Sequence, residues 1–270
     1  MIYTNLKLNM QIFIAIALSF FLLFFTWIES YRLSCLALLF PVIMLAVVTY
    51  GYYELKMHQR RCFAKCYLKK DTFASKIFVS KSYFTLLFYT ILTTAMVTST
   101  FTVVIGFSRL LWVYFFIHIL LSYILFIFLS KRLKYALNEE YNLLFAREWT
   151  INIMALLLIV VFTYITLNSY IPTYLSSSLE QTITSAMASS SSSCEIIDSI
   201  LKYTKVADST FWWIVNESTT QINNTLLKTF IWIVFILYNS LALLGINRLI
   251  VVSLYLFKKS NILKSEKENV

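Results

Sequence analysis

His118 is the one ionisable side chain that lies deep inside an apolar stretch of the sequence. It sits near the middle of the run 110–130, between Ile117 and Ile119. An imidazole without a hydrogen-bond partner in hydrocarbon costs on the order of several kcal/mol, so this side chain needs a specific partner. Two interpretations are open: a neutral histidine that makes a structural hydrogen bond, or a proton or substrate site. We expect no carboxylate at the same depth, which favours the structural interpretation.

Within the run 83–107, threonine occurs at every fourth position from 90 to 102, which places these hydroxyls on one face of a helix. Such hydroxyls bond to their own backbone, join neighbouring helices or line a wet path through the membrane. Helix–helix bonding is the preferred interpretation and a substrate path is the alternative. Asn239, near the middle of the last apolar run, is a further polar group at depth. The candidate intramembrane polar site comprises His118, Thr90, Thr94, Thr98, Thr102 and Asn239.

The cysteines offer little chemistry. Cys62 and Cys66 lie one helical turn apart, and His58 precedes them by one turn, which gives three ligands where a structural zinc site needs four. Structural cysteines are the preferred interpretation of this pair, with reversible lipidation as the alternative. The four cysteines fall in different contexts or on opposite sides of the membrane, so we expect no disulfide framework, and Cys194 is left single outside.

No glycine-rich phosphate loop and no paired carboxylates in an arguable geometry accompany these residues. The sequence therefore predicts no catalytic residue, no bound cofactor and no metal site. It indicates a protein that is not an enzyme.

Composition identifies the elements that must position the polar groups. The 270 residues are 59% apolar and only 13% charged, with a mean hydropathy of +0.74, whereas soluble proteins contain roughly 25% charged residues. Uncharged runs of about 20 residues match the length that a helix needs to cross a bilayer. The sequence predicts an all-α, polytopic membrane helical bundle in one domain, 1–270, with a kink at Pro41. Its six transmembrane helices are 10–28, 33–53, 83–107, 110–130, 151–171 and 229–257.

Basic residues orient the predicted spans. With both termini inside, 18 of the 23 lysines and arginines fall on the cytoplasmic side, as the positive-inside rule requires. The net charge of +10 is then explained by anionic lipid at the cytoplasmic face, and nucleic acid is not an expected partner. We expect an integral protein of the plasma membrane or a bacterial inner membrane.

Three connections between the spans are long enough to fold. The segment 54–81 predicts a basic cytoplasmic helix, a turn and a second helix that continues into the third span. The segment 131–149 has one apolar stripe and predicts an interfacial amphipathic helix. The external segment 172–228 begins with a serine-rich, low-complexity half and ends with an amphipathic helical half.

The amphipathic half of the external segment is the best candidate for a partner surface. Its charges are mixed, so anionic lipid does not account for it, and its stripe has no obvious place to be buried. The sequence predicts that this stripe packs on a second copy of the chain or on another membrane subunit, with two tryptophans at the membrane interface. The surface comprises Ile196, Ile197, Ile200, Leu201, Trp212 and Trp213.

Three classes of function remain. A non-enzymatic membrane subunit that binds protein partners in an assembly comes first, by elimination. A channel or transporter that uses the hydroxyl-rich third span and His118 comes second, since only three glycines and two prolines argue against the broken helices of many transporters. A membrane-embedded enzyme comes third, because too few polar groups converge at one depth.

Overall fold

The computed structural model describes residues 2–69, 72–73, 83–169, 172–221 and 224–268, and its regular structure in these ranges is helical. Six helices are long and apolar enough to cross a membrane, which confirms the number expected from the sequence. These six are α1 (Ile2–Ser30), α2 (Leu39–Tyr67), α4 (Tyr83–Ile105), α5 (Arg109–Leu133), α6 (Glu139–Ser169) and α9 (Thr225–Glu268). The shorter elements are the 3-10 turn η1 (Cys35–Leu38), α7 (Leu179–Ala188) and α8 (Glu195–Gln221).

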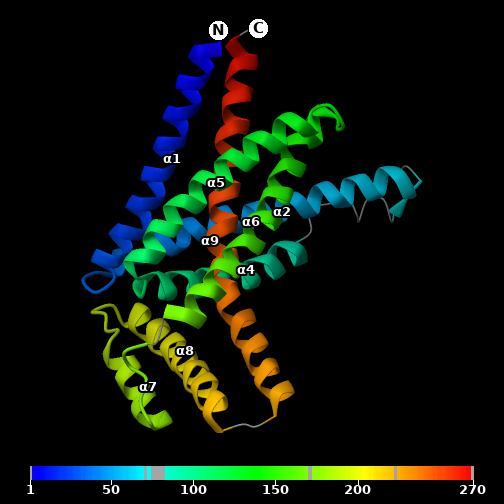
Figure 1. Ribbon diagram of the computed structural model, residues 1–270. Helices are drawn as coiled ribbons and strands as arrows, with labels where there is room; N and C mark the ends of the chain where they lie inside the picture. The colour runs from blue at the N-terminus through cyan, green and yellow to red at the C-terminus, as the bar shows by residue number, and fades with distance from the viewer. Residues whose placement is uncertain (1, 70–71, 74–82, 170–171, 222–223, 269–270) are drawn as a thin grey trace.

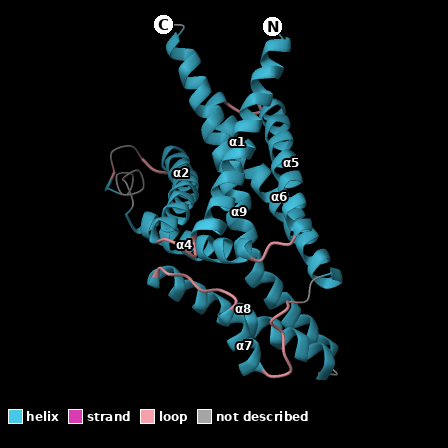
Figure 2. Ribbon diagram, turned by 90° about the vertical axis from the view of Figure 1, so that its left-hand side faces the viewer, coloured by secondary structure: helices cyan, strands magenta, loops and turns pink. Residues whose placement is uncertain are grey.

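The last helix, α9, is the common partner of the others. It runs through the middle of the molecule and packs against α1, α2, α4, α5, α6 and α8 (Figure 1). Glycine permits the closest approach: a Cβ atom on Gly245 would come within 2.7 Å of Thr100 Oγ1, and one on Gly51 within 2.7 Å of Val252. The chain termini lie at one end of the molecule, and α7 and α8 lie at the other (Figure 2).

One expectation about α2 is wrong. Pro41 lies in the first turn of α2, directly after η1, and not in the middle of a span. A proline is tolerated there because the N–H groups of the first turn have no partner within the helix. The helix continues without a break past residue 54 to Tyr67, so the first part of the basic segment is helical and continuous with the second span. The second helix expected before the third span falls mostly outside the described residues.

The segment 131–149, predicted to be one interfacial helix, is divided between α5, a turn and α6. Helix α5 continues to Leu133, and α6 begins at Glu139, so the second part of the segment forms the first turns of the fifth span. The Asn142 side chain donates to the backbone carbonyl of Ser130 across 3.0 Å and closes the turn between the two helices. Of the apolar residues in the α6 part of this segment, Leu144 is buried and Phe145 is 45% exposed.

Helices α7 and α8 form a hairpin, here called the cap. The serine-rich half that was expected to have low complexity contains α7, which begins after the N-cap Ser178. The serines after α7 attach the cap to the turn that follows α1. Ser192 Oγ donates to the carbonyl of Tyr31 across 2.5 Å, and Ser193 N donates to the carbonyl of Arg32 across 3.1 Å.

A disulfide between Cys35 and Cys194 fixes the cap, contrary to the expectation that no such bond forms. It joins η1 to the residue just before α8. The two cysteines are 159 positions apart, so no short spacing marks them as partners. The free cysteines, Cys62 and Cys66, lie near the other end of α2.

The amphipathic stripe of α8 packs on this chain itself. Ile197 and Leu201 are 2% and 1% exposed and belong to the same core as residues of α1 and α4. Trp212 is also buried, with its ring 4.8 Å from that of Phe235 in α9. Ile197, Leu201 and Trp212 therefore need no second subunit to cover them. Ile196 is well exposed, while Ile200 and Trp213 are partly buried.

Candidate functional site

A group of charged side chains, three of them buried, lies where α2, α6 and α9 meet. We call it the inner charge cluster, and it consists of Glu54 in α2, Arg147 and Glu148 in α6, and Arg248 and Lys259 in α9. Arg147 Nη1 lies 2.6 Å from Glu54 Oε2, and Lys259 Nζ lies 2.8 Å from Glu54 Oε1. Arg147 Nε lies 2.8 Å from Glu148 Oε1. The cluster therefore joins three helices of the bundle.

The Arg147 guanidinium is completely buried but well satisfied. Its Nη2 donates to the carbonyl of Gly51 across 3.1 Å, and its Cζ lies 4.6 Å from the ring centroid of Tyr255. The Tyr255 hydroxyl donates in turn to Glu54 Oε1 across 2.9 Å. Buried charges persist only when they are paired and hydrogen-bonded, and these contacts meet that condition.

Arg248 forms the second half of the cluster. Its Nη2 lies 3.4 Å from both carboxylate oxygens of Glu148, and its Cζ lies 3.4 Å from the ring centroid of Tyr52. A guanidinium over an aromatic face gains a cation–π attraction that increases when water is excluded. Tyr52 therefore attaches α2 to α9 at a second point, beside Glu54.

Glu54 is a buried carboxylate at the start of the segment 54–81, which was expected to be a cytoplasmic connection. It is 8% exposed and belongs to a helix that is a candidate membrane span. One signal was present in the sequence, because Glu54 is the only acidic residue between Glu29 and Asp71, in a segment full of bases. The sequence does not reveal its partner, since Arg147 is 93 residues away.

His118 is completely buried and has a partner on one side only. Its Nε2 lies 3.2 Å from Asn247 Oδ1, and Asn247 Nδ2 donates to the carbonyl of Ile151 across 2.8 Å. His118 Nδ1, Tyr114 Oη and Ser122 Oγ have no hydrogen-bond partner among the described residues. The three side chains are four residues apart, so they share one face of α5. This line is continuous with the inner charge cluster through Asn247 and Arg248, which are neighbours in α9.

The four candidate threonines do not join helices. Each donates to the carbonyl of a residue four positions earlier in α4: Thr90 to Leu86, Thr94 to Thr90, Thr98 to Thr94 and Thr102 to Thr98. The interhelical hydroxyls are two neighbours that sequence reasoning passed over. Thr93 Oγ1 lies 2.6 Å from Thr49 Oγ1 in α2, and Thr100 Oγ1 donates to the carbonyl of Ala242 in α9 across 2.9 Å.

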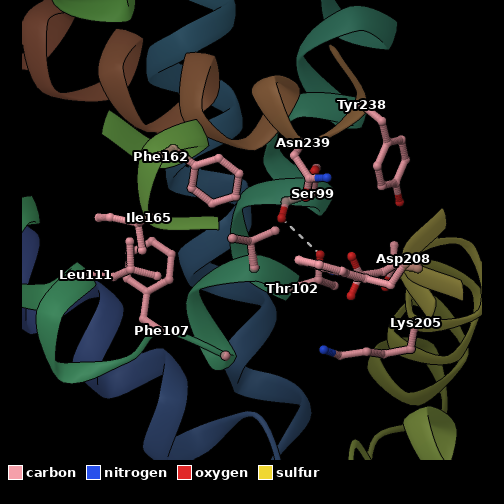
Figure 3. A pocket seen from close by; sticks show the side chains of 14 residues that line it. Ser99, Thr102, Phe107, Leu111, Phe162, Ile165, Lys205, Asp208, Tyr238 and Asn239 are labelled. Atoms are coloured by element: carbon pink, nitrogen blue, oxygen red, sulfur yellow. Dashed lines mark hydrogen bonds between the residues drawn. The ribbon is translucent and has the colours of Figure 1, made fainter. Parts of the chain in front are cut away.

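A pocket of about 720 Å³, part of it open to the surroundings, lies between α8 of the cap and the helices α4, α5, α6 and α9. We call it the outer pocket. Figure 3 shows apolar side chains on one side of it and polar groups on the other. The apolar side includes Phe107, Leu111, Phe162 and Ile165, and the polar side includes Ser99, Thr102, Thr204, Lys205, Asp208 and Asn239. Of the candidate polar residues, only Thr102 and Asn239 line this pocket.

Asp208 and Lys205 supply the charges of the outer pocket. The Tyr174 hydroxyl donates to Asp208 Oδ2 across 2.7 Å, and Lys205 Nζ lies 5.8 Å from the ring centroid of the same tyrosine. Burial raises the pKa of the Asp208 carboxyl above its ordinary value, although the Tyr174 hydrogen bond and the nearby Lys205 oppose the shift. The pocket thus holds a partly buried carboxylate.

A smaller apolar cavity of about 330 Å³ adjoins the outer pocket and shares Phe107, Leu111 and Phe162 with it. Tyr114 also lines this cavity, and its ring centroid lies 6.1 Å from that of His118. The outer pocket, this smaller cavity and the polar side chains around His118 therefore form a series that leads from the cap towards the inner charge cluster.

No protein-family model, no curated protein and no solved structure matches the chain. Within the described ranges, no group of three or more His, Cys, Asp or Glu side chains is placed to hold a metal ion.

Proposed function

We propose that this chain is a carrier that moves a small solute across the membrane by alternating access. One combination of features supports the proposal: a pocket that lies against α8 of the cap, and ion pairs of the buried Glu54 that join α2, α6 and α9 away from that pocket. Ionisable side chains within membrane helices are costly and commonly mark a solute or proton route. In the proposed transport cycle, this conformation is the outward-facing state.

The disulfide supports the orientation that this proposal needs. Disulfides persist in oxidising compartments outside the cytosol, and Cys35 and Cys194 are bonded at the cap end. Cys62 and Cys66 are free towards the other end. Together with the placement of basic residues, this favours a cap outside the cell and both termini in the cytoplasm.

The inner charge cluster would act as the inner gate. Opening it separates Glu54 in α2 from Arg147 in α6 and Lys259 in α9, which leaves buried charges to be solvated by water. A solute that binds the inward-open state more tightly than the outward-open state offsets part of that cost, because a ligand shifts a conformational equilibrium only through such a difference. The central position of α9 makes it the element that must move relative to α2 and α6.

Sided labelling tests the gate without knowledge of the solute. We would place a cysteine at Ser99, which lines the outer pocket, in a chain with Cys62→Ser and Cys66→Ser. A membrane-impermeant maleimide should label it from the cap side. Adding Glu54→Gln should weaken the gate and increase labelling from the cytoplasmic side several-fold, and the milder change Lys259→Met should act in the same direction.

The matched control is Asp198→Asn, which removes a surface ion pair of the cap with Lys202 and should change neither rate. The unfolding temperature of every variant shows whether altered labelling reflects loss of structure. If labelling comes from the cap side alone in both gate variants while they remain folded, the carrier proposal fails.

A partner-binding subunit is the second candidate, and one surface favours it. Ile196, Tyr203 and Ile214 are 59%, 79% and 39% exposed, and their spacing returns them to the same outward face of α8. A second copy of the chain would cover this face. Migration on a native gel should then change in the variant Tyr203→Ser/Ile214→Ser, whereas a monomer in every mild detergent would exclude this candidate.

A further inference from the structure

We propose that the outer pocket binds a zwitterionic amino acid with an apolar side chain. The geometry of the pocket is the evidence for this binding site. The further statement that the bound amino acid is the transported solute rests on the carrier function proposed above. A zwitterion carries an ammonium and a carboxylate on one carbon atom and an apolar body beyond it. The outer pocket offers complementary groups in the same order.

The two charges of the pocket lie close together but are not paired with each other. Lys205 and Asp208 are three residues apart on α8, which places their Cβ atoms about 5–6 Å apart on one face. Both side chains point from α8 towards the pocket (Figure 3). Among the described residues, no ion pair joins them, whereas the preceding Lys202 pairs with Asp198 across 2.6 Å.

Tyr174 contacts both Asp208 and Lys205, which explains why the two charges do not pair with each other. Its hydroxyl occupies one carboxylate oxygen of Asp208, and its ring lies under the ammonium of Lys205. Asp208 Oδ1 is left to accept from a ligand ammonium, and the Lys205 ammonium is left to donate to a ligand carboxylate. A zwitterion satisfies both groups at once and leaves no net charge to be buried.

The rest of the pocket fits the body of such a ligand. Phe107, Phe162 and Ile165 form an apolar wall opposite the charges. A ligand with a charged head and an aromatic or branched aliphatic side chain would place each part against a matching surface.

Three probes that share a phenyl ring separate this ligand class from its neighbours. Isothermal titration calorimetry of the full chain in detergent would use L-phenylalanine, 2-phenylethylamine, which has only the ammonium, and 3-phenylpropionate, which has only the carboxylate. L-phenylalanine should bind most tightly. Asp208→Asn should weaken L-phenylalanine and the amine by roughly tenfold or more, since a hydrogen bond to a charged group is lost. Lys205→Met should weaken L-phenylalanine and the acid in the same way.

Lys202→Met is the matched control, because this lysine lies on α8 but does not line the pocket. Asp208→Glu keeps the charge and should restore part of the affinity, which separates loss of a ligand contact from misfolding. If L-phenylalanine does not bind, binds no more tightly than a singly charged probe, or is unaffected by either pocket variant, the proposal is wrong. Binding is measured without a membrane, so a negative binding result does not affect the labelling test of the carrier. If binding is intact but the gate variants show no cytoplasmic labelling, only the transport proposal is refuted.

Discussion

Arg147 in α6 and Glu54 in α2 form a 2.6 Å ion pair in which the arginine is completely buried. Removing one partner of a buried pair leaves the other charge uncompensated, which costs about 3–5 kcal/mol. We expect Arg147→Met to lower the unfolding temperature strongly in detergent. The double variant Arg147→Met/Glu54→Gln should recover part of the loss. Lys202→Met, which removes an exposed pair, should cost less than about 1 kcal/mol. Equal effects of the buried and exposed changes would contradict this account.

The cap offers a second comparison between neighbouring residues of one type. Ile197 is 2% exposed in the core and Ile196 is 59% exposed. We expect Ile197→Ala to cost about 2–4 kcal/mol through lost burial and a cavity, and Ile196→Ala to cost less than about 0.5 kcal/mol. Chemical denaturation in detergent measures both. A large effect at Ile196 would instead indicate a partner on the outward face of α8.

The hydroxyls of α4 divide into two groups that substitution should separate. Thr93→Val and Thr100→Val remove hydrogen bonds to other helices and should cost about 0.6 kcal/mol each, the mean for such bonds in membranes. Thr94→Val and Thr98→Val remove only bonds within α4 and should be nearly neutral. Unfolding temperatures of the four variants provide the comparison. If Thr94→Val and Thr98→Val cost more than Thr93→Val and Thr100→Val, the bonds between helices would belong to the face predicted from the sequence.

Sidedness and the disulfide can be examined together. We expect a cysteine at Ser191 to react with an impermeant reagent from outside, and cysteines at Lys65, Lys134 and Lys264 to react from the cytoplasm. Cys35→Ser should destabilise the cap by about 2 kcal/mol, the lower end of the usual range, because the membrane already restricts the unfolded chain. Gel mobility with and without reductant reports the bond. Labelling of the Ser191 position from the cytoplasm alone would reverse the topology.

Binding in the outer pocket should depend on pH through Asp208. Its raised pKa means that the neutral acid persists above pH 3.8, so the ligand ammonium loses its carboxylate as the pH falls through the raised value. The affinity of 2-phenylethylamine should therefore rise with pH across that interval and then level off. Tyr174, Lys205 and Tyr238 face the same carboxyl. Calorimetry at several pH values should show a flat profile for Asp208→Asn, and a sloping one would assign the effect to another group.

The same shift predicts the sign of a stability change. An acid whose pKa is higher in the folded than in the unfolded chain favours folding when it is protonated. Its contribution is present at low pH and is lost as the pH rises from 3.8 through the raised value. The Asp208→Asn variant lacks this titrating group. As the pH rises through the same interval, its unfolding temperature should therefore fall less than that of the unsubstituted chain.

The sequence predicts the parts of the fold that depend on local pattern. The six apolar helices follow from uncharged runs of about 20 residues, and each run lies largely within one of them. Where a helix passes beyond its apolar run, the pattern no longer indicates burial. Glu54 and Arg147 lie just past such boundaries, so they are read as solvated although both are buried. Ile197 was assigned to a partner because its stripe has no nearby sequence to cover it, whereas its neighbours in the core come from α1 and α4.

The candidate site was only partly predictable for the same reason. His118 is evident because it interrupts an apolar run, and the structure buries it completely. Its partner Asn247 is 129 residues away, and Cys35 and Cys194 are 159 residues apart. Such pairs are set by how helices meet in space, which a single sequence does not encode as a spacing. Asp208 and Lys205 read as one more turn of a mixed-charge helix until α4, α6 and α9 are placed around them.

The central helix α9 has a consequence for how the protein is made. The chain emerges from the ribosome in sequence order, so the five earlier apolar helices enter the bilayer before the helix that they share. During that interval Glu54 has Arg147 but not Lys259 or Tyr255, and His118 lacks Asn247. The nascent chain therefore carries a half-assembled polar interior, and insertion of α9 is the step that completes it. A ribosome that stalls before residue 225 would release a membrane protein whose polar groups remain partly unpaired, a natural substrate for quality-control proteases.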